Sequence, residues 1–318
     1  RKTEWQASAG SHTIHSLPFT TVACMSPQTA APTPPGLFPM EHPDRTPASS
    51  KQHGPIRVGV GGWVYAPWRD NFYPADLLRR LELDYASRHL RAIEVNGTYY
   101  SAQKPATYAK WAEATPPGFV FSLKAPRYIT ESRPLAHSGK GVDSFIYGGI
   151  EEMGDRLGPI LWQLPPSRKF DADDLDAFLQ ALPRVLNGRP LRHVLEVRNP
   201  GFLCPAYVEL ARKHAIPTVF TDSPKFPSLA DLTGDFVYAR LMRSIEEIAT
   251  GYEDRALDQW AAHAQAWAAG RDIDALPHVG ATQPPGPPRE VFVFFISSAK
   301  LRNPAAAMAL QERVDRLA

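Results

Sequence analysis

The chain of 318 residues has few cysteines and no long apolar run, and these absences exclude several classes of protein. Its two cysteines, Cys24 and Cys204, form neither a disulfide framework nor a cysteine-based metal motif, so a reducing, cytoplasmic location is predicted. No stretch approaches the roughly 18 apolar residues of a membrane-spanning helix, and no membrane partner is expected. The 35 basic and 33 acidic residues nearly balance, which predicts no global field that would attract nucleic acid.

The composition of the whole chain, 43% apolar and 21% charged, is that of an ordinary globular protein. Residues 1–55 differ, because they are rich in Pro, Thr, Ser and His and show no sustained periodicity. We expect a disordered or linker-like, dispensable tail over 1–55, within which Met40 is one candidate translation start, and a folded domain over 56–318.

Eight short runs rich in β-branched and aromatic residues predict eight strands. They cover residues 56–60, 93–96, 119–124, 159–166, 193–198, 217–222, 236–241 and 291–296. Helical patterns separate most of them, at 76–89, 105–114, 171–182, 204–214 and 253–269, with a last helix from Asn303. Only about a dozen residues part the sixth and seventh strands, too few for a full crossover helix.

This series predicts an α/β fold, a TIM-like (β/α)₈ barrel, for which about 250 residues are typical. The competing architecture is a doubly wound open sheet, which normally carries G-x-G-x-x-G after its first strand. Residues 59–64 read Gly-Val-Gly-Gly-Trp-Val, and Val64 stands where the last glycine belongs. The barrel is therefore preferred.

Polar side chains recur where the predicted strands end. Glu94 and Asn96 share one face of their strand, as do Glu196 and Arg198 of theirs, because alternate residues in a strand point the same way. In TIM-barrel enzymes the reacting groups lie at these carboxyl ends. A buried ion-pair network is the alternative role, although such pairs add little net stability.

Several motifs stand in a fixed order along the chain. They are Gly61-Gly62-Trp63 with Trp68 and 72–74, then 94–100, 124–130, 163–166, 196–198 and 222–224. Together they closely resemble the YecE-like family (domain of unknown function 72, DUF72) of bacterial and archaeal proteins, over residues 56–318. The resemblance implies a TIM-like barrel and no established reaction.

The chain departs from the pattern of that family at three places. Glu131 replaces a common histidine, residues 199–202 read Asn-Pro-Gly-Phe instead of His-x-Ser-Trp, and residues 296–300 lack an Asn-Asn-Asp-like run. These differences predict a subgroup with its own ligand.

Lys124 is the leading catalytic candidate, because a lysine among apolar strand residues can have a lowered pKa and act as a base or a Schiff-base nucleophile. A salt bridge to Glu94 or Glu196 is its alternative role. Those two carboxylates are the other catalytic candidates, for acid–base work or, with Asp222, for a hard divalent cation. No metal site is predicted, since no histidine ends a strand and the carboxylates face Lys and Arg. No organic cofactor is expected.

Other residues at the strand ends and in the loop 63–74, which is rich in aromatic residues, are candidates for substrate binding. They are Trp63, Trp68, Asn96, Tyr99, Arg127, Gln163, Arg198, Asp222, Arg240 and Lys300. The aromatic rings either stack on a sugar or base or cap the barrel. Residues 297–303 precede the last helix and either bind a phosphate or form a plain capped helix start.

The preferred hypothesis is an enzyme that acts on a small anionic substrate, for example a phosphorylated one, by acid–base or electrostatic chemistry. The first alternative is a protein that binds or processes nucleic acid, and the second is a non-catalytic ligand-binding barrel. The sequence leaves the substrate, the reaction and the oligomeric state open.

Overall fold

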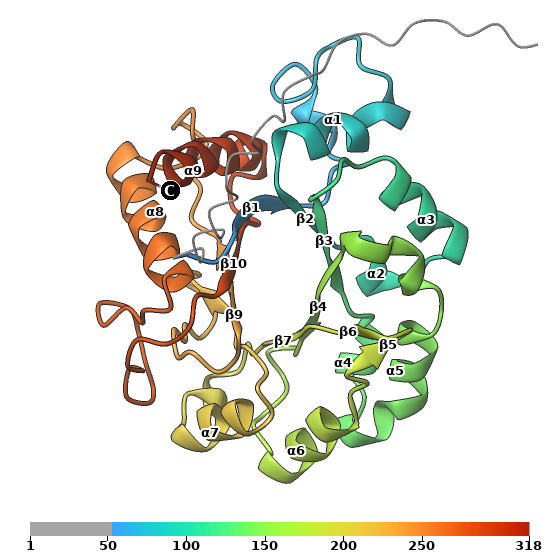
Figure 1. Cartoon of the computed structure of the whole chain (residues 1–318), viewed down its shortest axis with the longest axis vertical. Helices are drawn as coiled ribbons and strands as arrows, with labels where there is room; N and C mark the ends of the chain where they lie inside the picture. Colours follow the sequence, from blue (N-terminus) through green and yellow to red (C-terminus); the bar gives the residue numbers. More distant parts are fainter. Residues whose placement is uncertain (1–52, 318) are drawn as a thin grey trace, which may run out of the picture. The chain divides into compact units, whose positions relative to one another are not determined.

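The computed structural model describes residues 53–317, and its central element is a ring of eight parallel strands (Figure 1). The strands are β1 (Ile56–Gly61), β2 (Ala92–Val95), β3 (Val120–Lys124), β4 (Leu157–Gln163), β7 (His193–Glu196), β8 (Phe220–Thr221), β9 (Phe236–Leu241) and β10 (Glu290–Phe295). Their neighbour order is β7-β4-β3-β2-β1-β10-β9-β8, with parallel pairing at every step. The predicted tail, Cys24 and Met40 included, lies outside the described residues except for its last three positions.

The ring closes at a seam between β7 and β8. The pairing there consists of a bridge between Leu195 and Thr218, just before the two-residue strand β8. The Leu195 amide donates to the Pro217 carbonyl at 3.0 Å, and the Val219 amide donates to the Leu195 carbonyl at 2.9 Å. The eight-stranded TIM-like barrel predicted from the sequence is thus confirmed.

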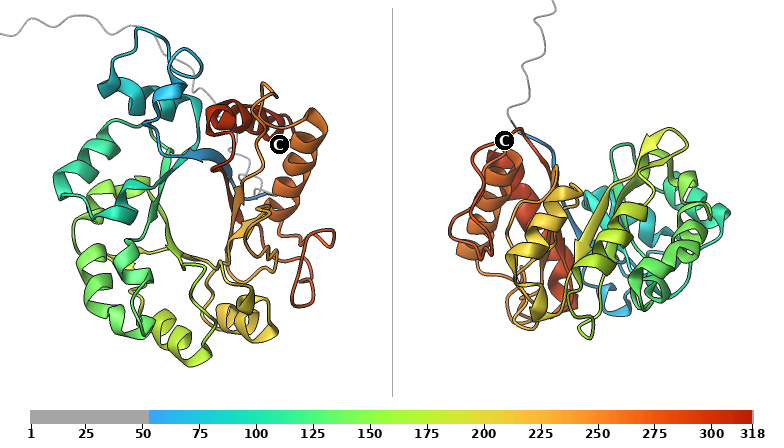
Figure 2. Two further views of the ribbon diagram at one scale, coloured as in Figure 1. Left: turned by 180° about the vertical axis from the view of Figure 1, so that it is seen from behind. Right: turned by 90° about the horizontal axis from the view of Figure 1, so that it is seen from below.

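Helices surround this ring on its outside (Figures 1 and 2). The longer ones are α1 (Glu82–His89), α3 (Pro105–Glu113), α5 (Gly139–Ile146), α6 (Ala172–Ala181), α7 (Pro205–Lys213), α8 (Asp254–Ala268) and α9 (Asn303–Leu317). Two single-turn helices, α2 (Gly97–Tyr100) and α4 (Arg127–Thr130), follow β2 and β3 directly. No helix of the described residues is long and apolar enough to cross a membrane.

One local prediction needs correction, and one element was missed. The helix expected from residue 76 begins at Glu82, after a 3₁₀ turn (Arg79–Leu81), because Leu78 is extended and the Leu77 carbonyl accepts from Arg69 instead. A small hairpin, β5 (Val185–Leu186) with β6 (Arg189–Pro190), was not predicted. Its Asn-Gly turn, with positive φ at Asn187 and Gly188, is a strong hairpin signal that identifies it in retrospect.

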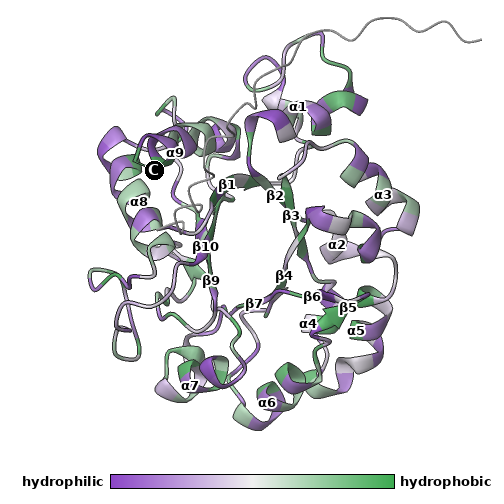
Figure 3. Ribbon diagram, in the orientation of Figure 1, coloured by the Kyte–Doolittle hydropathy of each residue, from purple (hydrophilic) through white to green (hydrophobic). Residues whose placement is uncertain are grey.

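Apolar residues form one layer between strands and helices and a second, smaller cluster inside the ring. Figure 3 shows β1 and β2 coloured mainly as apolar, whereas the outer helices carry both colours. The interior cluster includes Ala92, Val120, Val194, Phe236 and Phe292, which lie toward the amino ends of their strands. Two or four residues further along the same faces, the inward side chains become polar on β2, β3, β4, β7 and β9, whereas β10 stays apolar through Phe294 and Ile296. This change in polarity places the candidate site at the carboxyl ends.

Candidate active site

Five polar side chains at the carboxyl ends of the strands are buried in the ring. Glu94 comes from β2, Lys124 from β3, Gln163 from β4, Glu196 from β7 and Arg240 from β9, and none is more than 8% exposed. Each follows an apolar inward residue on its own strand, or a Ser or Tyr, at the two-residue spacing of a strand. The fold therefore brings together all three predicted catalytic residues.

Arg240 joins the two buried carboxylates. Its guanidinium donates to Glu94 Oε1 at 3.0 Å and to Glu196 Oε2 at 2.5 Å. Arg198 donates from Nε to the second oxygen of Glu196 at 2.8 Å, and Tyr238 donates to the second oxygen of Glu94 at 2.8 Å. Every carboxylate oxygen of the pair is thus hydrogen-bonded, as buried charges require.

This network keeps Glu196 ionised. Burial alone would raise the pKa of the Glu196 carboxyl, but the charges of Arg240 and Arg198 outweigh burial and hold that pKa below its ordinary value. Tyr238, which donates its hydrogen bond to Glu94 and therefore accepts from the Ser122 hydroxyl at 2.9 Å, has its pKa raised far above its ordinary value by burial and by Glu94. A carboxylate of lowered pKa is a poor proton donor near pH 7.

Lys124 lies beside this network without joining it. Among residues 53–317 no hydrogen bond and no carboxylate within 4 Å pairs with Nζ, which stands 4.0 Å from the centre of the Tyr99 ring. Burial lowers the pKa of Lys124 to about 8, while Glu94 raises that pKa and Arg240 lowers it further. The salt bridge considered as its alternative role is therefore not formed, and the neutral amine is accessible near physiological pH.

The short helix α2 carries the ring that covers Lys124. The Thr98 hydroxyl lies 3.1 Å from the Val95 carbonyl and 2.8 Å from that of Lys124, so α2 is tied to the ends of both β2 and β3. Tyr99 is partly buried, which raises its pKa, and the charges of Glu131 and Arg198 also act on it. The pattern of the sequence predicted Tyr99 but not the anchoring role of Thr98.

Two buried polar groups in the ring lack partners within the described chain. Gln163 is 5% exposed, its Oε1 is fully buried, and neither atom of its amide is hydrogen-bonded. Nε of Arg240 is likewise buried and unpaired. Unpaired buried polar groups are rare in proteins, and a ligand is one explanation for them.

The charges of the cluster do not cancel. Lys124, Arg198 and Arg240 contribute three positive charges, against two negative charges from Glu94 and Glu196. Arg198 is 17% exposed and stacks on the Phe226 ring at 4.1 Å, so it is the cation of the network nearest to solvent. While Lys124 is protonated, the cluster carries one excess positive charge, and Arg198 is the cation that a small anion reaches first.

A smaller hollow of about 290 Å³ adjoins the ends of β1 and β2. It is lined by Gly61, Gly62, Trp63, Val64, Val95, Asn96, Gly97, Gln103, Trp111 and Lys300. Trp63 meets Trp111 edge to face, with 5.2 Å between ring centres. Three predicted binding residues, Trp63, Asn96 and Lys300, therefore share one cavity.

Trp68 and Tyr65 contact the backbone and the side chain of Lys300 and hold its loop in place. Trp68 is fully buried and donates from its indole nitrogen to the Lys300 carbonyl at 2.8 Å, so it supports the loop and offers no surface to a ligand. Lys300 Nζ lies 4.5 Å from the centre of the Tyr65 ring, and burial lowers its pKa. Arg302, the other cation within the predicted phosphate-binding residues 297–303, instead donates to the Glu246 carbonyl at 2.7 Å.

Two other predicted binding residues lie apart from the buried cluster. Asp222 accepts from the Met242 amide at 2.5 Å and from the Tyr252 hydroxyl at 3.4 Å, which ties together the loops after β8 and β9. Arg127 is exposed at the start of α4, near Tyr99. Among residues 53–317, no three His, Cys, Asp or Glu side chains converge as metal ligands would, so Asp222 does not meet the two glutamates.

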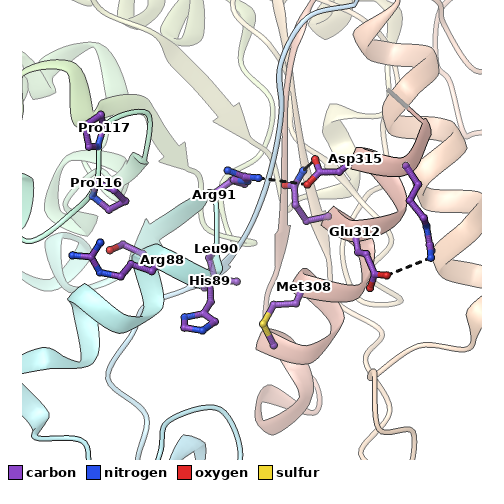
Figure 4. Close-up of a pocket in the computed structure, with 12 residues that line it drawn as sticks. Arg88, His89, Leu90, Arg91, Pro116, Pro117, Met308, Glu312 and Asp315 are labelled. Carbon is purple, nitrogen blue, oxygen red and sulfur yellow. Dashed lines mark hydrogen bonds and ion pairs between the residues drawn. The ribbon is translucent and has the colours of Figure 1, made fainter.

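A larger hollow, of about 780 Å³, lies beside the amino ends of β2 and β3, where α1 ends and α9 passes (Figure 4). Its charged side chains face one another: Arg91 meets Asp315 at 3.4 Å, and Arg316 meets Glu312 at 3.3 Å. In a TIM barrel this end serves stability instead of catalysis. The smaller set of groups at the carboxyl ends is therefore the better candidate site.

Comparison with known proteins agrees with this architecture. The sequence profile of DUF72, described as a protein of unknown function, matches residues 57–318. The chain belongs to the DUF72 family.

Solved structures of the DUF72 family show the same fold. A DUF72 family protein from Thermotoga maritima superposes with a TM-score of 0.60 at 23% identity, covering 83% of this chain and 98% of that one. A second, from Enterococcus faecalis, gives 0.59 at 15% identity, covering 83% and 99%. At these identities the likeness establishes the fold alone.

A curated relative is UPF0759 protein YunF of Bacillus subtilis (strain 168). It is 24% identical over 159 residues, which are 48% of this chain and 54% of YunF. The chain thus spans about half the length of this relative. The resemblance inferred from the ordered motifs is confirmed, and the chemistry of the site has to be argued from its own residues.

Proposed function

We propose that this chain is an enzyme that acts on a small anionic substrate, with Lys124 as the group that reacts. One observation carries the proposal: Lys124 is buried beside two glutamates, yet forms no ion pair with either, because Arg240 holds both. A buried amine without a counter-ion is costly to a fold, and such groups cluster at functional sites. In its neutral form Lys124 is a base of suitable strength near pH 7.

The other residues receive supporting roles. Arg198, the exposed end of the network, and the unpaired amide of Gln163 bind the substrate, with Arg127 at the rim. Glu94 and Glu196 are positioning residues, because their oxygens are occupied by Arg240, Arg198 and the Tyr238 hydroxyl. This assignment replaces the acid–base role that the sequence predicts for the two carboxylates.

Binding is tested by thermal unfolding of the full chain with sugar phosphates, small carboxylic acids, divalent cations and short oligonucleotides. A ligand that binds only the folded state at 100 times its Kd stabilises it by about 2.7 kcal/mol. We expect selective stabilisation by a small anion, lost in Arg198→Gln and retained in Arg302→Gln, a cation committed to a carbonyl outside the cluster.

Catalysis is tested on the stabilising compound by following deuterium exchange from solvent into its C–H positions by NMR. We expect exchange in the wild type and none in Lys124→Met. Binding without exchange or turnover would favour a non-catalytic barrel. Stabilisation by oligonucleotides alone, falling steeply with salt, would favour the nucleic-acid hypothesis. If none of the compounds changes the unfolding temperature, the support for an anion site is removed.

A further inference from the structure

The lone pair of Lys124 is in a position to form a bond as well as to accept a proton. Its Nζ is unpaired within the described chain, and Arg240 and Arg198 lie near enough to lower its pKa. Burial and neighbouring cations are the two features that activate lysines for attack on carbonyl groups. Glu94 and Glu196 do not compete for this amine, because their four oxygens have other partners.

The surroundings also suit what such an attack produces. The buried Gln163 amide follows Leu161, the residue of β4 that pairs in register with Lys124, by two positions, so both side chains face the interior from neighbouring strands. Its unpaired oxygen and NH₂ group can hold a hydroxyl or carbonyl oxygen. Arg198, the most exposed cation of the network, can pair with an anionic group elsewhere on the same compound.

We propose that Lys124 forms a covalent imine with an aldehyde or ketone that also carries a carboxylate or phosphate group. This inference rests on the proposed function and names the class of its substrate. It goes beyond proton transfer, since the amine and the substrate carbon become joined.

The step balances without any co-reactant. The Nζ lone pair attacks the carbonyl carbon, a C–N bond forms while the C=O π bond breaks and its electron pair moves to the oxygen, and that oxygen receives one of the nitrogen protons to give a carbinolamine. The C–O bond then breaks, the nitrogen lone pair forms the C=N bond, and the oxygen leaves as water with the second nitrogen proton. The Gln163 amide is placed to hold the oxygen during both stages.

Lys300 is the matched control. It too is near the carboxyl ends, is partly buried and has a lowered pKa, but its Nζ lies over the Tyr65 ring, it lines the hollow of about 290 Å³, and it has no part in the network of Glu94, Glu196 and Arg240. General lysine reactivity would modify Lys300 at least as readily as Lys124. If Lys124 lies in a specific imine-forming site, the carbonyl probes should modify Lys124 alone.

The experiment is reductive trapping on the full chain. Pyruvate, dihydroxyacetone phosphate and glyceraldehyde 3-phosphate are each added with sodium borohydride, with acetone and propanal as uncharged probes, and peptides are read by mass spectrometry. We expect an adduct at Lys124 with at least one anionic carbonyl compound, at least tenfold above the uncharged probes. The adduct disappears in Lys124→Met and persists in Lys300→Met.

Two results would overturn the inference: no adduct at Lys124 with any probe, or equal labelling of Lys124, Lys300 and surface lysines. Either is distinguishable from failure of the proposed function. If Lys124→Met abolishes deuterium exchange while no imine is trapped, proton transfer by Lys124 stands and the covalent step falls. If neither exchange nor trapping is seen, both fall.

Discussion

Replacing Lys124 by methionine is expected to stabilise the protein while destroying its reactive group. The folded pKa of Lys124 is about 8, below the ordinary value of 10.5 that applies to the unfolded chain. Between these values the unfolded state binds more protons, so the free energy of unfolding of the wild type rises with pH. Below pH 8 both states are protonated, and the fold bears the full cost of a buried ammonium group.

The size of this cost follows from the pKa difference. A difference of 2.5 units at 1.36 kcal/mol per unit gives about 3 kcal/mol at pH 7. Lys124→Met removes this cost and nearly preserves the side-chain volume, so its unfolding free energy at pH 7 should exceed that of the wild type by about 3 kcal/mol, or roughly 6–12 °C in Tm. At pH 9.5 the same pKa values leave a gap of about 1.5 kcal/mol.

The assay is urea unfolding followed by circular dichroism at both pH values. Part of any gain could come from the greater apolarity of methionine, but that part does not change with pH, so the narrowing of the gap isolates the charge. A variant less stable than the wild type at pH 7, or a gap that is unchanged at pH 9.5, would refute the account of Lys124 as an uncompensated buried amine.

Three further predictions concern other features. Arg240→Met deprives two buried carboxylates of their shared partner and should cost about 3–5 kcal/mol at pH 7 by the same urea assay, opposite in sign to Lys124→Met. Burial lowers the pKa of His193 to about 4, so the unfolded state takes up a proton first as pH falls; stability should drop by about 2 kcal/mol between pH 7 and pH 5, and not in His193→Gln. Gly59→Ala would bring a Cβ within 2.0 Å of a backbone carbonyl oxygen and should lower the unfolding midpoint sharply, whereas Gly97→Ala, whose Cβ meets nothing within 4 Å, should leave it unchanged.

The strands were predictable because a barrel strand is short, apolar and bounded by turns. The run at 236–241 coincides with β9, and the absence of a helix before it follows from the few residues available after β8. The sixth predicted strand, 217–222, is reduced to two residues in β8, because its first half pairs through the bridge at Thr218 instead. The pattern of hydrophobic residues indicates which positions are buried, but it does not indicate how many backbone hydrogen bonds a strand forms with its neighbours.

The site was predictable at the level of position along each strand but not at the level of pairing. Alternation places Glu94 and Glu196 on the inner face, yet only the three-dimensional register shows that Arg240 takes both and leaves Lys124 alone. The part of Tyr238 was missed, although it stands two residues before Arg240 and therefore shares its face. Trp68 looked like a binding residue because aromatic rings near a strand end serve both packing and recognition.

The seam between β7 and β8 has fewer backbone hydrogen bonds than the other strand pairs of the barrel, so these two strands should separate more easily. It lies directly under Glu196 and Arg198, and it is closed by amides of Leu195 and Val219 and not by a long ladder. Local opening is governed by such sparsely bonded stretches, and amide hydrogen exchange measures it. A ligand that bridges Arg198, just after β7, to the unpaired Nε of Arg240, on β9, would span this seam and hold its two sides together. Slower hydrogen exchange at the amides of Leu195 and Val219 would then show that a ligand occupies the site, without any assay of the reaction.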